Sequence, residues 1–223
     1  MDYAEWEPIY REILKDFGFS EEEDIHAARV LDGLLEGRSP PNLLERLGGL
    51  LRGARVNIYG AGPSLERLAT IPKGINITAD GATSYLMERG AVPEIIVTDL
   101  DGRVEDQIRA AEGGSIAVVH AHGDNIHRLK PHVPRFRACI GTTQARPFGR
   151  LHNFGGFTDG DRAVIMAEHL GARAAVLHGM DFRGEAGRYS FKGGGERKRR
   201  KLLWAERLIK RTAEAGRMEI AFG

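Results

Sequence analysis

Cysteine is almost absent from this chain of 223 residues, which contains only Cys139. A single thiol excludes an intramolecular disulfide and leaves no thiolate cluster for zinc. An excess of charge of one sign is also absent, because 32 lysines and arginines balance 31 acidic residues to a net charge of +1. This balance argues against nucleic acid and against an anionic membrane surface as partners.

Long apolar runs are missing as well, since no stretch reaches the roughly 20 residues that a membrane-spanning helix needs. The N-terminus carries Asp2 and Glu5 before Trp6, and so lacks the basic and apolar regions of a signal peptide. We therefore expect a cytoplasmic protein. A hydrophobic content of 42% and a charged content of 28% are typical of one large folded domain with a full core.

Residues 1–53 have the pattern of helices. Apolar residues recur every three or four positions from Trp6 to Phe17, and Ser20 with Glu23 has the spacing of a capping box for a second helix. Two prolines then precede a third, leucine-rich segment. No residue of this part suggests a chemical role, so we expect an N-terminal helical segment that caps the sheet or forms a dimer surface.

From residue 54 onward, short apolar runs alternate with helical patterns, which is typical of an α/β protein. Most of these runs do not alternate cleanly between apolar and polar residues, as expected for parallel strands covered on both faces. We predict a doubly wound, Rossmann-like, mostly parallel sheet in a catalytic domain of residues 54–223. The predicted strands are 55–59, 75–78, 94–98, 115–119, 136–140 and 174–178.

Glycine and small polar or acidic residues follow nearly every predicted strand. The segments are GAGPSL (60–65), ADGA (79–82), DLDG (99–102), HAHGDN (120–125), GTT (141–143) and GMDF (179–182). In open α/β sheets, ligands bind outside the carboxyl ends of the strands. We therefore place the functional site at this edge of the sheet.

Two carboxylates, Asp99 and Asp101, directly follow the apolar run 95–97. If the backbone stays extended there, these residues point the same way, because residues two apart share a face of a strand. Neighbouring carboxylates repel each other unless a cation lies between them. The pair therefore predicts a Mg²⁺ site that handles phosphate, and a solvated turn after a strand is the alternative.

Gly60 and Gly62, followed by a proline and Ser64, predict a turn from strand to helix where backbone can approach a ligand. The free N–H groups of such a turn can hold a phosphate. As a dinucleotide fingerprint the motif is incomplete, because Leu65 stands at the third glycine position, although Asp80 lies where a ribose-binding acid would fall. Dinucleotide binding and a purely structural turn remain alternatives.

Thr158 and Asp161 have the spacing of an N-cap pair at the start of a helix. Such a pair explains both residues without any ligand. It does not explain Asp159, which lies between them and follows two glycines at 155 and 156.

His120, His122 and Asp124 alternate along one segment, so that all three lie on one side of it if it is extended. This spacing is compatible with a zinc site. Hydrogen bonds to phosphate or to a heterocycle, and an ordinary structural role, are the alternatives.

Lys192 and three glycines precede a basic run, RKRRK (197–201), on a helix with an apolar side. Such a run is often no more than a solvated helix face. The alternative is a lid, hinged at the glycines, that closes Lys192, Arg197 and Lys201 over a polyphosphate. Nucleic-acid binding is disfavoured, because the net charge is near neutral and no aromatic residues are interleaved with the cations.

Six motifs, taken in order, resemble the archaeal 6-hydroxymethyl-7,8-dihydropterin diphosphokinase family over about residues 54–205. They are GAGPSL (60–65), ADGA (79–82), TDLDG (98–102), HAHGDN (120–125), FTDGDRA (157–163) and GMDF (179–182). That family in turn looks like thiamine pyrophosphokinases, whose acidic motifs have their counterparts here in Asp80, Asp99, Asp101, Thr158 and Asp159. The departures from the thiamine motifs, which favour a pterin, are Ala82, Thr98, Gly102 and Arg162.

The resemblance implies a thiamine-pyrophosphokinase-like core that transfers the terminal diphosphate of ATP to the hydroxymethyl group of a reduced pterin and releases AMP. Such a reaction would belong to pterin biosynthesis of the folate or methanopterin type. The alcohol attacks the β-phosphorus, so catalysis depends on positioning and on neutralising charge. The resemblance implies that Mg²⁺ binds Asp99, Asp101 and Asp159. The residues expected to hold ATP are Gly60, Gly62, Ser64, Asp80, Thr158, Lys192, Arg197 and Lys201.

Asp124 and Asn125 are expected to contact the pterin, because a carboxylate and an amide match its amino-pyrimidinone edge. His120 is expected to contact substrate, and His122 to contact phosphate or to act as an acid or base. A homodimer is compatible with the sequence. Three alternatives remain: a thiamine-pyrophosphokinase-like enzyme acting on another alcohol, a dinucleotide-binding protein, and a sugar-nucleotide transferase. The last is kept because proline and serine after the glycines resemble glycosyltransferase-like motility accessory proteins.

Overall fold

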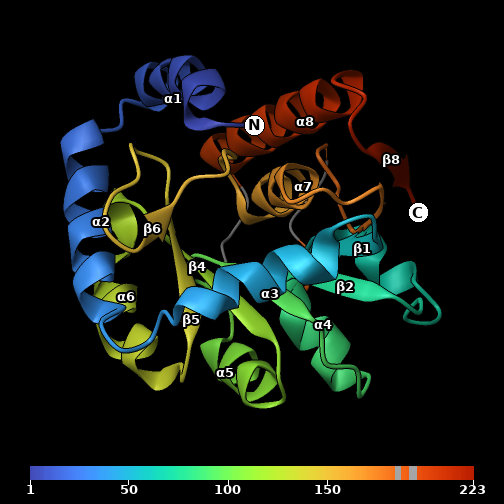
Figure 1. Cartoon of the computed structure of the whole chain (residues 1–223). Helices are drawn as coiled ribbons and strands as arrows, with labels where there is room; N and C mark the ends of the chain where they lie inside the picture. Colours follow the sequence, from blue (N-terminus) through green and yellow to red (C-terminus); the bar gives the residue numbers. More distant parts are fainter. Residues whose placement is uncertain (184–186, 191–194) are drawn as a thin grey trace.

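The computed structural model of the chain describes residues 1–183, 187–190 and 195–223. One eight-stranded sheet is flanked by helices on both faces (Figure 1). The α-helices are α1 (Tyr3–Phe17), α2 (Glu21–Leu34), α3 (Pro41–Leu51), α4 (Ala82–Glu88), α5 (Val104–Glu112), α6 (Ile126–His132), α7 (Asp159–His169) and α8 (Glu196–Glu214). The strands are β1 (Arg55–Tyr59), β2 (Ile75–Ala79), β3 (Ile95–Thr98), β4 (Ile116–Ala121), β5 (Cys139–Thr143), β6 (Leu151–His152), β7 (Ala174–His178) and β8 (Glu219–Phe222). Short 3-10 helices are η1 (Pro63–Arg67), η2 (Gly123–Asn125) and η3 (Val133–Arg135).

The strands lie in the order β6-β5-β4-β3-β2-β1-β7-β8, and each neighbouring pair is parallel. From β1 the chain first adds strands in one direction and then crosses to the other side of β1 to form β7. The order therefore reverses at β1, which makes the sheet doubly wound. This confirms the fold class predicted from the sequence.

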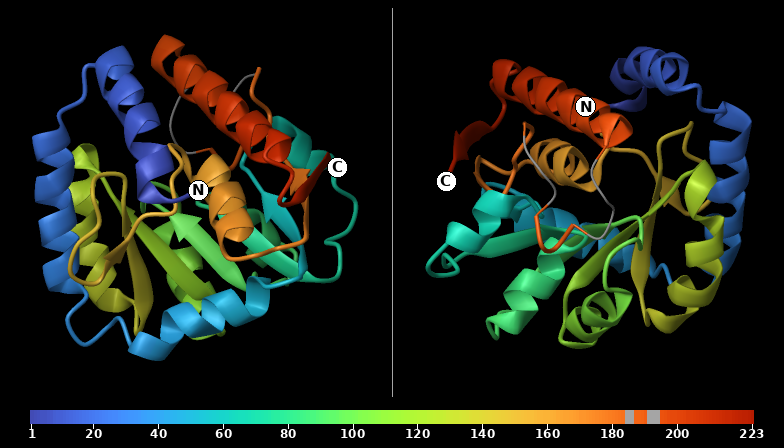
Figure 2. Two further views of the ribbon diagram at one scale, coloured as in Figure 1. Left: turned by 45° about the horizontal axis from the view of Figure 1, so that its top comes forward. Right: turned by 180° about the vertical axis from the view of Figure 1, so that it is seen from behind.

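Alternate residues of the strands belong to two separate hydrophobic cores. Val118 of β4 packs in a core with α3 and α7, whereas Ala117 and Val119 pack with α2, α5 and α6 on the other face. A third cluster joins α1 to the outer sides of α7 and α8. Figure 2 shows α1 and α8 side by side above α7 in both views.

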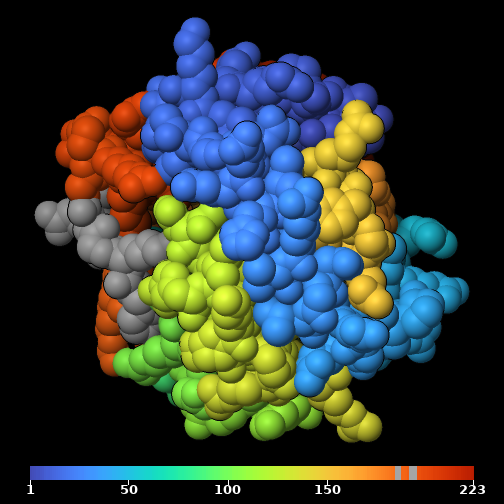
Figure 3. Space-filling model, turned by 90° about the vertical axis from the view of Figure 1, so that its left-hand side faces the viewer, coloured from blue at the N-terminus to red at the C-terminus, as the bar shows by residue number. Residues whose placement is uncertain are grey.

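The first two helices both begin at a capping side chain, and the sequence had indicated the cap of the second. Oδ1 of Asp2 accepts a 2.8 Å hydrogen bond from the Glu5 N–H, and Oε2 of Glu5 accepts one from the Asp2 N–H at 2.9 Å. Ser20 caps α2 by accepting a 3.3 Å hydrogen bond from the Glu23 N–H. Helix α2 runs along the β6 edge and contacts α6, as the blue and yellow-green segments of Figure 3 show. A domain boundary at residue 53 stays a prediction, and helices α2 and α3 before it pack into the same cores as the strands.

The strand predictions hold for β1 and β7, and are wrong in detail elsewhere. The chain makes the turn η3 before β5, so this strand begins at Cys139 rather than at Phe136 and contains Thr142 and Thr143. Strand β4 likewise extends through His120. The short edge strands β6 and β8 were not predicted, because two residues in one and exposure in the other leave little apolar signal.

Among the described residues, no helix combines the length and the apolar character that crossing a membrane requires.

Candidate active site

A cavity of about 460 Å³ opens at the carboxyl ends of the strands, the edge predicted from the sequence. Its wall includes Gly60 after β1, Asp80 after β2, Asp99 after β3 and Gly179 after β7. Residues of α2 and the first turns of α7 and α8 close its other sides. The crossovers of the sheet thus bring together residues that are far apart in the sequence.

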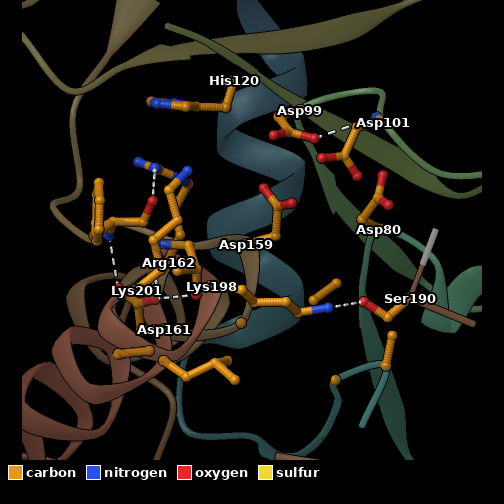
Figure 4. Close-up of a pocket in the computed structure, with 18 of the residues that line it drawn as sticks. Asp80, Asp99, Asp101, His120, Asp159, Asp161, Arg162, Ser190, Lys198 and Lys201 are labelled. Atoms are coloured by element: carbon orange, nitrogen blue, oxygen red, sulfur yellow. Dashed lines mark hydrogen bonds between the residues drawn. The ribbon is translucent and has the colours of Figure 1, made fainter. Parts of the chain in front are cut away.

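Three carboxylates meet in this cavity. One oxygen from each of Asp80, Asp99 and Asp159 lies within 4.8 Å of the other two. Figure 4 shows Asp159 facing Asp80 and Asp99 across the cavity. Three anions at this separation repel one another, so the arrangement favours a hard divalent cation with oxygen ligands between them.

The turn after β2 fixes the position of Asp80. Its backbone has φ of 43°, in the left-handed region. Its Oδ1 accepts hydrogen bonds from the Thr98 hydroxyl at 2.7 Å and from the Gln107 amide at 2.8 Å. The residue facing this carboxylate, Gly102, has to be a glycine, because a Cβ there would lie 2.5 Å from Oδ2 of Asp80. Neighbouring elements therefore hold this carboxylate at the cavity wall before any ligand binds.

Burial and mutual repulsion both disfavour ionisation of these carboxyls. Burial, followed by the charges of Asp101 and Asp99, raises the pKa of Asp80 to about 8. Burial and the neighbouring carboxylates also raise the pKa of Asp159 well above its usual value, although the Arg162 guanidinium opposes this. Because an oxygen-only donor set with unfavourable anionic charge is what Mg²⁺ relieves, these residues fit a Mg²⁺ site.

Asp99 is held from two sides. Its Oδ2 lies 3.1 Å from Nε2 of His122, and its Oδ1 accepts a 3.2 Å hydrogen bond from the Asp101 N–H. Leu100 has φ of 66°, so the chain is not extended between the two acidic residues. Asp101 lines the cavity but lies outside the group of three. The geometry therefore adds Asp80 to the candidate ligands, and Asp101 as a ligand stays a prediction.

The start of α7 confirms the predicted N-cap pair. Asp161 accepts hydrogen bonds from the Phe157 N–H at 2.6 Å, from the Thr158 N–H at 2.8 Å and from the Thr158 hydroxyl. The Thr158 hydroxyl thus belongs to the cap, whereas we had predicted that it contacts ATP. Asp159 is the first residue of the helix, and its carboxylate lies at the cavity.

The glycines after β1 line the cavity, but their N–H groups donate within the protein. The Gly60 N–H donates to the carbonyl at the end of β7 at 2.8 Å, and the Gly62 N–H to the Gly179 carbonyl at 2.9 Å. The Ser64 N–H donates to Oδ2 of Asp181 at 2.7 Å. A Cβ on Gly62 would lie 2.6 Å from the Gly179 oxygen. These glycines therefore let the loop after β7 pack closely, and the predicted cradle of free N–H groups is not formed by these three residues.

The zinc alternative is wrong for the part of the chain that the structure describes. His120, His122 and Asp124 do not form a metal-binding group there. His122 faces Asp99, and His120 is buried in the sheet. Asp124 is exposed, and its Oδ2 lies 3.7 Å from Nη2 of Arg197.

Asn125 is 2% exposed, and its amide is occupied by the protein itself. Its Oδ1 accepts a 3.0 Å hydrogen bond from the His122 N–H. Its Nδ2 donates to the carbonyls of Asp99 at 3.0 Å and of His120 at 2.8 Å. Asn125 therefore ties the loop after β4 to β3. The structure does not place it at the predicted contact with a pterin, because it is buried outside the residues that line the cavity and both of its N–H groups already donate.

Helix α8 brings cations to the cavity. Arg197, Lys198 and Lys201 line it, and Nζ of Lys198 donates a hydrogen bond to the Ser190 hydroxyl. Two of the three predicted lid cations are thus at the site, and Lys198 is an addition. Lys192 lies outside the described residues, and so do two of the three predicted hinge glycines.

The N-terminal helices also contribute to the site, which we had not predicted. Asp24 of α2 lines the cavity and is 3% exposed. It accepts hydrogen bonds from the Tyr10 hydroxyl at 2.6 Å and from the Gln144 amide at 2.7 Å. The available signal was an acidic residue on the same helix face as Ala28 and Leu31, which are buried.

A protein-family model described as 6-hydroxymethylpterin diphosphokinase MptE-like matches residues 31–186. The chain belongs to this family. The resemblance found in the sequence motifs is thereby confirmed.

Three archaeal proteins named 6-hydroxymethyl-7,8-dihydropterin pyrophosphokinase align with this MptE-like chain over most of its length. The protein of Pyrococcus furiosus is 41% identical over 99% of this chain and 98% of its own. The protein of Methanocaldococcus jannaschii is 38% identical over 94% of this chain and 95% of its own. That of Methanothermobacter thermautotrophicus is 43% identical over 94% of both chains.

Among solved structures, the MAf glycosyltransferase of Magnetospirillum magneticum has a similar fold, with a TM-score of 0.55 and 16% sequence identity. The match covers 90% of the MptE-like chain but 38% of the glycosyltransferase. At this identity the likeness concerns the fold alone.

Proposed function

We propose that this chain transfers the terminal diphosphate of ATP to the hydroxymethyl group of 6-hydroxymethyl-7,8-dihydropterin and releases AMP. The observation that carries the proposal is the meeting of Asp80, Asp99 and Asp159 beside the cations of α8. Three relatives aligned over nearly the whole chain are named for this activity. The enzyme would act in pterin biosynthesis in the cytoplasm, and a homodimer stays a prediction.

The carboxylates would hold Mg²⁺. Asp80, Asp99 and Asp159 offer the hard oxygen donors, and Mg²⁺ bound there would neutralise charge on the phosphates. The raised pKa values of Asp80 and Asp159 support this, because a cation removes the repulsion that causes part of the shift. Lys198 and Lys201 would bind phosphate oxygens on the side of α8.

In the transfer itself, the hydroxyl oxygen of the acceptor forms a bond to the β-phosphorus of ATP. The bond from the β-phosphorus to the oxygen bridging it to the α-phosphorus breaks, AMP leaves with that oxygen, and the hydroxyl proton is released to water. The chain contributes by holding the two substrates in line and by stabilising charge on the transferred group. His122 contributes by orienting Asp99.

The test is to measure AMP after incubation of the chain with Mg-ATP and either the dihydropterin, thiamine or no acceptor. We expect AMP with the dihydropterin alone, and none when EDTA replaces Mg²⁺. Asp159→Asn should lower the rate by at least about 10²-fold, because it removes one anionic ligand and keeps the shape of the side chain. Asp32→Asn on α2, outside the cavity, is the matched control and should keep the wild-type rate.

The same assay separates the other functions. AMP formed with thiamine and not with the dihydropterin would identify a thiamine pyrophosphokinase. A sugar-nucleotide transferase would form no AMP from ATP and would release a nucleoside diphosphate from its donor. The similarity to a glycosyltransferase supports the fold and does not favour that activity.

A further inference from the structure

The cavity has two chemically different flanks, one on each side of the acidic group. The β1 flank carries backbone turns and a cation, and consists of Gly60, Gly62, Asp181, Ser190 and Lys198. The α2 flank carries aromatic rings and buried polar side chains, and consists of Phe19, Asp24, His120, Gln144, Phe157 and Arg162. Figure 4 shows His120 and Arg162 on one side of Asp159, and Asp80, Asp99 and Asp101 on the other.

Asp24 is a buried carboxylate that the protein holds in a fixed orientation. The Tyr10 hydroxyl and the Gln144 amide donate to its Oδ2 at 2.6 and 2.7 Å, and the Gly123 N–H donates to its Oδ1 at 2.8 Å. A carboxylate has about four acceptor positions. These three bonds therefore leave capacity for one further N–H donor at the cavity.

One buried nitrogen on this flank, Nε of Arg162, has no hydrogen-bond partner among the described residues, and Arg162 is 3% exposed. The charge of Asp24 acts on this guanidinium, so the two groups belong to the same part of the cavity. Nε of Arg162 is a donor. Buried polar atoms without partners are costly, and a ligand in the cavity is one way to satisfy them.

Aromatic rings line the same flank. Phe19 and Phe157 lie with ring centroids 6.4 Å apart and planes tilted by 52°. The Arg197 guanidinium lies 4.9 Å from the Phe19 ring centre, and Nζ of Lys201 lies 5.4 Å from that of Phe157. Apolar ring faces next to fixed donors and acceptors are typical of a site for a flat heterocycle.

Building on the proposed function, we propose that the α2 flank binds the 2-amino-4-oxopyrimidine ring of the pterin and that Asp24 accepts a hydrogen bond from its amino edge. This edge carries two neighbouring donors, the ring N3–H and the 2-amino group, next to an oxygen acceptor. Asp24 accepts a hydrogen bond from one of these donors, and Nε of Arg162 donates a hydrogen bond to the oxygen. Adenine also offers one donor and one acceptor, and the dissociation constant of an ATP analogue therefore serves to separate the two ligands. ATP then occupies the β1 flank, where Lys198 lies.

This assignment replaces Asp124, the carboxylate first predicted to contact the pterin. The side chain of Asp124 is 68% exposed and pairs with Arg197. A hydrogen bond to an exposed carboxylate discriminates weakly, because water competes for it. Asp24 is buried, so the loss of its partner costs much more.

The first experiment measures the dissociation constant of 6-hydroxymethylpterin, a fluorescent oxidised analogue, for the full chain and for Asp24→Asn. We expect at least about tenfold weaker binding in the variant, because its amide replaces a charged acceptor. The dissociation constant of a non-hydrolysable ATP analogue should not change. Asp32→Asn, the same substitution two turns later on α2, should bind the pterin as the wild type does. If Asp124→Asn weakens pterin binding and Asp24→Asn does not, the proposal is overturned.

The second experiment changes the ligand, because Asp24→Asn also alters three internal hydrogen bonds and the variant can fail to fold. In 6-hydroxymethyllumazine an oxygen replaces the 2-amino group. This oxygen is an acceptor, and it would face the Asp24 carboxylate, which is also an acceptor. We expect the wild-type chain to bind it at least about tenfold more weakly than 6-hydroxymethylpterin. Equal binding of the two compounds overturns the inference about Asp24 and leaves the proposed function standing. If the chain binds neither compound, the inference about Asp24 and the proposed function are both overturned.

Discussion

Nε2 of His122 lies 3.1 Å from Oδ2 of Asp99, and this contact joins the loop after β4 to the acidic group after β3. Asn125 holds the same loop through the Asp99 carbonyl. A carboxylate that already has a fixed partner loses less freedom when it binds a cation. His122 is therefore a positioning residue for Asp99, in addition to any contact with phosphate.

Replacing His122 with alanine should weaken the affinity for Mg²⁺ rather than abolish the reaction. We expect the Mg²⁺ concentration for half-maximal rate to rise about 10- to 100-fold, because Asp99 loses its orienting partner. The rate at saturating Mg²⁺ should recover in large part. His127→Ala, at an exposed position on α6, is the control and should keep the wild-type curve. A His122 variant inactive at every Mg²⁺ concentration would instead indicate an acid or base.

The stability of the metal-free chain should fall as the pH rises from 7 to 8.5. The pKa of Asp80 is about 8 in the folded chain, against about 3.9 in the unfolded chain, so the folded state keeps a proton that the unfolded state has released. That contribution is lost as the pH passes 8, and the raised pKa of Asp159 acts in the same direction. Burial lowers the pKa of His120, and a histidine of the unfolded chain, with a pKa of about 6.5, is mostly deprotonated above pH 7, so its opposing contribution is small in this range.

Calorimetry at several pH values tests this expectation. The melting temperature should decline between pH 7 and 8.5, Mg²⁺ should raise it most at the higher pH, and Asp80→Asn should flatten the decline. A melting temperature that rises with pH in this range, without Mg²⁺, would contradict the assigned burial of these carboxyls.

Gly62→Ala should destabilise the fold by about 1–3 kcal/mol, because the added methyl group overpacks a tight contact. Its Cβ would lie 2.6 Å from the Gly179 carbonyl oxygen, a backbone atom that cannot rotate away. Gly48→Ala in α3 is the control, since a Cβ there meets no atom within 4 Å. Alanine should stabilise that helix by about 0.5–1 kcal/mol. Urea unfolding of both variants measures the difference.

Lys198→Met should raise the KM for ATP about tenfold while leaving the KM for the pterin unchanged. The ammonium group lies on the β1 flank, beside Ser190, where the proposal places the phosphates. Lys210→Met, three turns further along α8, removes the same charge from an exposed position and should leave both KM values unchanged. A rise in the KM for the pterin alone would instead place the pterin on the β1 flank and ATP on the α2 flank.

Local patterns made much of the fold predictable. The unalternating apolar runs of β3 and β7 reflect burial on both faces, and Ser20 and Thr158 show where α2 and α7 begin. The composition of the strand ends was enough to place the cavity at the correct edge of the sheet. The prediction for strand β5 was displaced by three residues, because Phe136 is buried at the end of the turn 133–135 rather than in the strand, which begins at Cys139.

The sequence by itself determined the α/β class, the edge that carries the site, the acidic character of that site and the family. Those features depend on periodicity and on motifs, which are local properties of the chain. Only the tertiary structure decided which carboxylates meet. Left-handed backbone at Asp80 and the hydrogen bonds from Thr98 and Gln107 bring Asp80 to Asp99 and Asp159. It also decided that Asp24 lies in the cavity, because that position depends on α2 packing against β4 and β5, about a hundred residues later in the chain.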